Sequence, residues 1–252
     1  MLPRMPRPDR VPRKSPRGGL LALRLLPLLG SFLVPVLAFA QVSAGPPTPL
    51  VTDLGKVPTG SWARYAMTVG AMPPMSMMIG LVAKTPAGDS LEMAIEAGMP
   101  AKVVTQVTLK GGADWDGKPQ KVVVQVGANE PIQMPTDGID GRFAKPDPKT
   151  FLKDETLKVA AGSFKTKHYR SKTAQGDTTD FWVTTAVAPI GLVKMVLTQK
   201  SNPMLSGPIT MELSAVGKDA KPAITRPAKP GDKDAVMKQM MAAAGAAPPA
   251  AK

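Results

Sequence analysis

The chain has 252 residues, no cysteine, and a formal net charge of +13 at pH 7. Without cysteine it has no disulfides and no thiolate sites, so its stability must come from an ordinary buried core. Only 4% of its residues are Phe, Trp or Tyr. That is too few for the stacking platforms of single-stranded nucleic-acid binders, and we expect no nucleic-acid partner.

The first forty residues have the pattern of an export signal. Basic residues from Arg4 to Arg17 precede an apolar stretch that ends in Ala38-Phe39-Ala40, a small-x-small cleavage site. We therefore expect cleavage near Ala40 and a periplasmic or secreted protein. The alternative is a retained membrane anchor, although a spanning helix needs about 20 apolar residues and Arg24 interrupts this stretch.

Removal of residues 1–40 leaves 25 basic and 18 acidic residues, a formal charge of +7. A net positive envelope protein favours anionic partners such as lipid headgroups or acidic polysaccharide. The alternative interpretation is a solvated surface whose net charge only keeps the protein soluble.

After a Pro-rich spacer at residues 41–50, apolar and polar residues alternate with a period of two as far as residue 218. This alternation predicts half-buried strands, and the short Gly-, Pro-, Asn- and Asp-rich connectors predict antiparallel meanders of about nine strands. The expected apolar face includes Ala63, Tyr65, Met67, Leu91, Val107, Val122 and Leu213, and the expected polar face includes Glu92, Thr108, Lys194 and Glu212.

A sheet of this size with one apolar face must close, form a sandwich, or curl and cover its concavity with another segment. We therefore predict an all-β domain with minor helix at residues 51–218. Its architecture would be an antiparallel unclosed barrel or strongly curved sheet with a loop or short-helix lid. Residues 127–155, a Pro-, Gly- and Asp-rich excursion, are the lid candidate, with Asp147 capping a short helix at 148–153. Residues 219–252 have low complexity, which predicts disorder with one short helix at about 233–244.

Two stretches resemble bacterial exported proteins. They are VAAGSFKTKHYR at residues 159–170 and DFWVTTAVAPIGLVKMVL at residues 180–197, and GSWARYAMTV at 60–69 is similar to the first strand of the same group. The likeness is to the outer-membrane lipoprotein carrier superfamily (LolA/LolB-like) or a bordering exported domain of unknown function. It implies an unclosed antiparallel barrel over an apolar concavity, and a carrier or scaffold that shelters an apolar group. The helical lid of true carriers is replaced here by a Pro/Gly/Asp loop.

Methionines are frequent on the expected apolar face. Flexible, polarizable thioethers let an apolar surface adapt to irregular guests. We therefore expect an apolar ligand site in the concavity lined by Met67, Met77, Ile79, Leu81, Met93, Met195, Met211 and Phe181.

The segment AMPPMSMMIG raises an alternative, because thioethers are also ligands for Cu(I). A copper site would use Met72, Met75 and Met78. The chain contributes only His168 as a nitrogen ligand, and we expect no cofactor or metal in the main interpretation.

Basic residues surround His168 in the segment 162–172. Lys165, Lys167 and Arg170 are candidates for contact with anionic headgroups, and the alternative is a solvated edge that resists unwanted strand pairing. We expect His168 itself to be structural or exposed, because no nucleophile or second histidine accompanies it.

These observations favour a non-enzymatic, exported cell-envelope protein that binds or carries an apolar or lipid-like ligand in a Met-rich concavity. The sequence shows no combination of nucleophile, base and orienting group. A structural or assembly factor with a filled core, or a Met-dependent copper binder, is the alternative.

Overall fold

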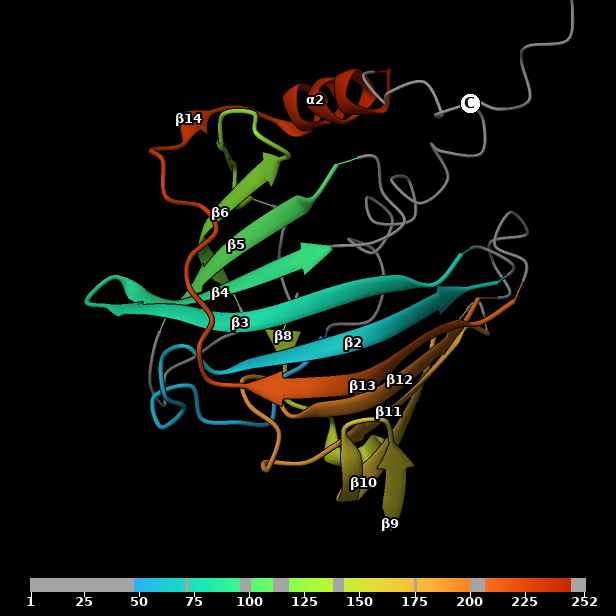
Figure 1. Cartoon of the computed structure of the whole chain (residues 1–252). Coiled ribbons are helices and arrows are strands. Elements are labelled where there is room, and N and C mark those ends of the chain that lie inside the picture. The colour runs from blue at the N-terminus through green and yellow to red at the C-terminus, as the bar shows by residue number, and fades with distance from the viewer. Residues whose placement is uncertain are drawn as a thin grey trace, which may run out of the picture.

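The computed structural model describes residues 48–70, 73–95, 101–110, 118–137, 143–174, 176–199 and 207–245. Within these ranges the chain is mostly strand, with a single α-helix and a 3-10 turn (Figure 1). The predicted signal segment and Met72 lie outside the described residues.

Twelve strands form one sheet, in the order β14-β7-β6-β5-β4-β3-β2-β13-β12-β11-β10-β9, and β1 pairs with β8 separately. The strands are β1 (Thr48–Pro49), β2 (Trp62–Val69), β3 (Met75–Thr85), β4 (Gly88–Ile95), β5 (Val103–Leu109), β6 (Pro119–Val126), β7 (Ile132–Met134), β8 (Phe143–Ala144), β9 (Phe151–Val159), β10 (Gly162–Lys172), β11 (Thr178–Val183), β12 (Leu192–Thr198), β13 (Ile209–Gly217) and β14 (Lys229–Pro230). The helices are η2 (Pro148–Thr150) and α2 (Lys233–Gly245).

The sheet is built from two antiparallel meanders that meet where β13 pairs with β2. It is strongly curved and does not close into a barrel (Figure 1). The prediction of an all-β protein with an unclosed curved sheet and minor helix is therefore confirmed. More strands occur than we expected, because β1, β7, β8 and β14 are two or three residues long and carry no period-two signal.

One face of the sheet carries the core. Tyr65, Leu81 and Leu213 have no exposed surface. Burial raises the pKa of the Tyr65 hydroxyl far above its ordinary range, and the hydroxyl donates a hydrogen bond to the carbonyl of Leu192 at 3.0 Å.

The chain itself fills the concavity over this face. The residues that pack there come from outside the large sheet and belong to the same core cluster as its strands. They are Phe143 of β8 and the loop residues Leu50, Leu54, Val57, Val187 and Ile190. Backbone bonds tie the loops together, from Leu50 to Ala144 and from Val51 to Ile190. The concave face is therefore packed over most of its width.

The turn before β12 requires glycine. Gly191 has φ of +85°, and a Cβ atom there would lie 2.2 Å from a Val51 methyl carbon and 2.8 Å from the Thr184 carbonyl. A side chain would meet both strain and collision at this position. This turn holds the segment at Val51 against the end of β11, since the Val51 amide donates to the Ile190 carbonyl and the Thr184 amide to the Gly191 carbonyl.

The middle excursion is more regular than we expected. Asp147 caps η2 and accepts a hydrogen bond from the Lys149 amide at 2.9 Å. The predicted helix ends at Thr150, and residues 151–155 begin the edge strand β9. Pairing with β10, in which Phe151 is the register partner of Tyr169, holds this segment as a strand.

The C-terminal region differs from the predicted disorder. Residues 218–232, here called the strap, cross the outer face of the sheet from β13 to β14 and α2 (Figure 1). The carboxylate of Glu92 on β4 accepts hydrogen bonds from the amides of Ala223 at 2.7 Å and Ile224 at 3.2 Å. Arg226 donates to the carbonyls of Ala128 and Asn129. Composition predicted a free tail because these partners are more than ninety positions away in sequence.

The strap changes the burial of residues that we expected on the polar face. Glu92 is only 3% exposed and Thr108 only 7%. Glu92 also accepts a hydrogen bond from Gln106 at 3.0 Å, and Thr108 is bonded to Ser90. This half of the sheet is covered on both faces. No helix within the described ranges is long and apolar enough to cross a membrane.

Replacement of Glu92 should release the strap. In Glu92→Gln a carboxylate that accepts from two backbone amides becomes an amide, and buried donors lose charged partners, which costs about 1–3 kcal/mol. Urea unfolding should show this loss, and amide exchange at Ala223 and Ile224 should accelerate. Glu212→Gln removes an exposed carboxylate paired with Lys194 and should change the free energy of unfolding by less than about 0.5 kcal/mol. Equal effects of the two substitutions would contradict the role of Glu92.

Candidate functional site

A single row of side chains crosses seven strands on the concave face. Each member is the register partner of the next. From β9 to β3 the row is Phe151, Tyr169, Phe181, Met195, Met211, Met67 and Met75. We call it the cross-strand row. Its first three members are aromatic and its last four are methionines.

The predicted apolar site residues do share this face, as the alternation indicated. Met77, Ile79, Leu81, Phe181 and Met211 belong to the main core cluster, and Met93 and Met195 pack against it half-buried. Met67 and Met75 belong to a second cluster with Val69, Leu197 and Ile209. None of the eight predicted residues lines the pocket described below. The methionines are packed against the protein's own loops and strands, and this differs from the open lining that we expected.

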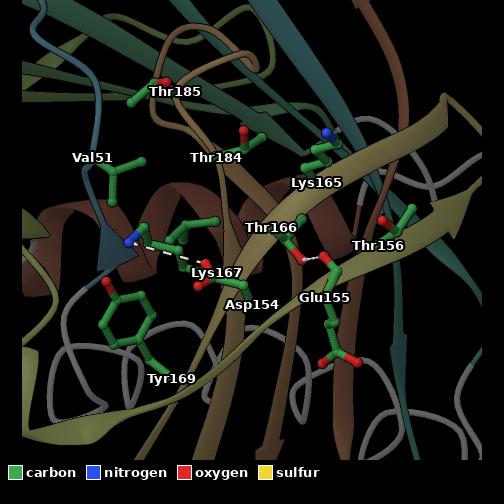
Figure 2. A pocket seen from close by; sticks show the side chains of 11 residues that line it. Val51, Asp154, Glu155, Thr156, Lys165, Thr166, Lys167, Tyr169, Thr184 and Thr185 are labelled. Atoms are coloured by element: carbon green, nitrogen blue, oxygen red, sulfur yellow. Dashed lines mark hydrogen bonds and ion pairs between the residues drawn. The ribbon is translucent and has the colours of Figure 1, made fainter.

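A pocket of about 570 Å³ opens at the β9–β10 end of the concave face. Small-ligand sites commonly span about 300–1,000 Å³. Its lining residues are Val51, Asp154, Glu155, Thr156, Lys165, Thr166, Lys167, Tyr169, Val183, Thr184 and Thr185. Figure 2 shows that Thr184 and Thr185 come from the loop after β11, and that the Glu155 carboxylate points away from the other lining side chains.

Strand register arranges the pocket in three rungs of different polarity. Lys165 is paired with Thr156, and Lys167 with Asp154 and Val183. Tyr169 is paired with Phe151 and Phe181. Since alternate residues of a strand lie about 6.7 Å apart, the pocket changes from cationic and hydroxylated to aromatic over about 13 Å.

The aromatic rung is a continuous surface. The rings of Phe151 and Tyr169 are 5.6 Å apart in an edge-to-face arrangement, and those of Tyr169 and Phe181 are 5.7 Å apart and stacked. The Lys167 ammonium lies 5.5 Å from the Phe151 ring centroid. Phe151 is 39% exposed, so this rung remains open to solvent where the methionine rungs are closed.

The pocket lining holds two lysines, Lys165 and Lys167, and two acids, Asp154 and Glu155, but not every lysine is paired. Lys167 approaches Asp154 at only 4.0 Å, and both side chains are largely exposed. Lys165 forms no ion pair with any described residue. The β9–β10 hairpin as a whole has six basic and two acidic side chains. A ligand with an anionic group therefore meets an available ammonium at the Lys165 rung.

Of the three basic residues predicted to contact anions, the structure brings two together. Lys165 and Lys167 line the pocket. Arg170 lies on the opposite face, because it is an odd number of residues away, and its Nε atom donates to Asp180 at 2.8 Å. Arg170 therefore does not share the pocket with the two lysines, and its contact with anionic headgroups stays a prediction.

That opposite face holds a cluster around the only histidine. His168 is 6% exposed, with Nε2 2.7 Å from Asp180 and Nδ1 3.2 Å from Glu155. Trp182 stacks on the imidazole with ring centroids 4.2 Å apart and donates its indole N–H to Glu155 at 2.7 Å. The hydrogen bond from Trp182 and then that from Lys153 lower the pKa of Glu155 below its ordinary value. Sequence reasoning missed this cluster because Asp180 and Glu155 are far from His168 in sequence. They come near it only through the register of β9, β10 and β11.

The geometry separates the proposed copper ligands. Met75 lies on the core face opposite Met67, and Met78 lies on the other face opposite Arg64. Two thioethers on opposite faces of a strand cannot bind one ion, and Met72 lies outside the described residues. Within the described part of the chain, no three His, Cys, Asp or Glu residues are grouped to hold a metal ion.

Comparisons with known proteins add little to this picture. No protein-family model matches the chain, and no curated protein matches it. Among solved structures it is similar to the 2.0 Å structure of the hypothetical protein CT021 from Chlamydia trachomatis, with 8% sequence identity and a TM-score of 0.38. The likeness covers 70% of this chain and 94% of that chain, and at this TM-score we draw no conclusion from it.

The lowered pKa of Glu155 predicts a pH-dependent contribution to stability. A carboxyl group whose folded pKa lies below its ordinary value of 4.5 stabilises the fold fully above that value and loses this contribution as the pH falls through the lowered pKa. Urea unfolding of the wild type and of Glu155→Gln should therefore differ at pH 4.5 and above, and the difference should shrink between pH 4.5 and pH 2. A difference that grows as the pH falls from 4.5 to 2 would contradict the assigned contacts.

Proposed function

We propose that this protein is a non-enzymatic binder or carrier of an anionic amphiphile, and that the pocket on β9–β11 is its site. The observation that carries the proposal is the order of the three rungs, from a cationic end to an aromatic end within one pocket. An amphiphile has the same order of polarity along its length.

Each end of the pocket has a defined role. At the first rung the Lys165 ammonium pairs with the acid group, and the hydroxyls of Thr156, Thr184 and Thr185 surround it. At the third rung the apolar chain covers Tyr169 and the exposed part of Phe151. Burial of apolar surface there stabilises the complex by roughly 25 cal/mol per Å² before the cost of ordering the ligand is subtracted.

The proposal moves the ligand site from the methionines to the aromatic end of the same row. The methionines lie beside the aromatic residues on the same face, since Met195 is the register partner of Phe181. Polarizable thioethers next to aromatic rings make favourable contacts and adapt in shape. The resemblance to lipoprotein carriers, the export signal and the envelope location remain predictions that agree with a lipid-like ligand.

A second candidate function is a structural or assembly factor of the envelope. The filled concavity favours it, because the loops at Leu50, Phe143 and Ile190 already occupy the space that a carrier would keep open. In that case the pocket at β9–β10 would be a surface hollow without a ligand of its own.

Calorimetric titration with dodecanoate distinguishes the two functions. We expect saturable binding of one dodecanoate, and weaker binding of dodecanol, which has the same chain without the acid. The double variant Lys165→Gln, Lys167→Gln should bind dodecanoate about fivefold to twentyfold more weakly, since exposed charge pairs contribute up to about 1 kcal/mol each.

The matched control removes the same charge elsewhere on the hairpin. Lys158 and Lys172 are exposed and do not line the pocket, so Lys158→Gln, Lys172→Gln should leave the affinity within about twofold. No saturable binding of dodecanoate by the wild type, or equal losses in both double variants, would favour the structural role.

A further inference from the structure

The cluster around His168 lies directly behind the pocket, on the other face of the same three strands. Its members come from β9 (Lys153 and Glu155), β10 (His168 and Arg170) and β11 (Asp180 and Trp182). Side chains of β9 next to Glu155, namely Asp154 and Thr156, form the pocket wall on the opposite face. A change in the cluster therefore acts on a strand that the pocket uses.

The imidazole has a carboxylate at each ring nitrogen. Nε2 is 2.7 Å from Asp180 Oδ1 and Nδ1 is 3.2 Å from Glu155 Oε1. A doubly protonated ring can donate to both acids, whereas a neutral ring has one N–H and one lone pair. The shorter contact keeps the N–H at Asp180, so the neutral ring turns its lone pair toward Glu155.

The buried atoms agree with this asymmetry. His168 Nδ1 is buried and has no hydrogen-bond partner among the described residues, while Nε2 is bonded to Asp180. The Glu155 carboxylate is 28% exposed and the Asp180 carboxylate 12%. The contact that depends on the second proton is thus the one between His168 on β10 and the Glu155 side chain on the edge strand β9.

Other charges around the ring are already paired. Lys153 lies 3.0 Å from Glu155 Oε2, and Arg170 lies 2.8 Å from Asp180. On the adjacent β12, Lys194 pairs with Glu212 at 2.9 Å and lies 6.0 Å from the Trp182 ring centroid. Of these side chains, the imidazole is the type that can carry either one or two N–H donors, and it is the common pH-sensitive group of proteins.

We propose that protonation of His168 controls how firmly β9 is held, and through β9 the wall of the ligand pocket. With the doubly protonated ring, the Glu155 carboxylate is paired with the imidazole on β10, and with the neutral ring that pairing is lost. The backbone ladder and the hydrogen bond from Thr166 to the Glu155 carbonyl remain in both states. β9 is the last strand of the sheet order, so among the described strands it pairs only with β10. The consequence for ligand binding rests on the proposed function, whereas the effect on β9 does not.

The protonation state of the ring is directly measurable because the chain has one histidine. Nitrogen-15 NMR of the imidazole between pH 5 and pH 9 gives the titration of His168 without assignment. In parallel, amide hydrogen exchange, corrected for the intrinsic pH dependence, gives the protection of residues 151–159. We expect protection of β9 to fall about threefold to tenfold as the ring loses its second proton, while protection of β4 and β5 stays constant.

Two substitutions test the mechanism. In His168→Gln and in Glu155→Gln the charge pair is absent, so protection of β9 should no longer depend on pH in this range. Lys172→Gln, which removes a charge from β10 outside the cluster, should keep the wild-type dependence. If either substitution prevents folding, the wild-type comparison and the remaining variant decide the question.

Each outcome has a defined meaning. Titration of the imidazole with unchanged protection of β9, or a pH dependence that persists in both cluster variants, would overturn the proposal. Dodecanoate affinity measured over the same pH range separates the two proposals. Loss of β9 protection without any dodecanoate binding would leave the His168 contact intact and reject the proposed function alone.

Discussion

Because successive side chains of a β-strand point to opposite faces, strand β10 sends Lys165, Lys167 and Tyr169 into the pocket and His168 and Arg170 to the other side. The neighbouring strands follow the same rule through their register. Every chemical feature of this end of the sheet depends on that alternation. A slip of one residue in the pairing of β10 would exchange the pocket and the histidine cluster.

The width of the sheet explains why the rest of the protein is filled. The apolar face of a twelve-stranded sheet is larger than the apolar patches that monomeric proteins usually leave exposed to water. Segments from three other parts of the chain therefore pack into the concavity around Phe143 and Ile190. The strap covers the outer face near β4 and anchors on Glu92. At the β9–β11 end the concave side stays accessible in the pocket, and this concentrates the available chemistry there.

Local patterns predicted much of this architecture. Alternation along β2 and β13 correctly placed Tyr65, Met67 and Met211 on one face. Capping preference identified the cap at Asp147. These features depend on residues within a few positions of each other.

Features that depend on distant contacts were not predictable from the sequence. The composition of the strap predicts disorder because Pro, Lys and Ala side chains bury little apolar surface. Its order comes from backbone amides that donate hydrogen bonds to the Glu92 carboxylate. The pocket combines β10 with Val51 and Thr184 from separate loops. The methionines were assigned to the correct face, but strand pattern does not reveal that loops fill the space above them.

The cross-strand row gives the two halves of the concave face different mechanical properties. Its aromatic members are rigid and in contact with one another, with centroids 5.6 Å and 5.7 Å apart. Its methionine members have three rotatable bonds each and fill gaps of irregular shape. Under the proposed function, a ligand that displaces the Tyr169 ring would also displace the stacked Phe181, whose register partner is Met195. A branched residue in place of Met195 would resist that displacement because its rotamers are few. A row that is rigid at the pocket and flexible at its methionine end would then adapt to apolar chains of different shape while Met211 and Met67 stay buried.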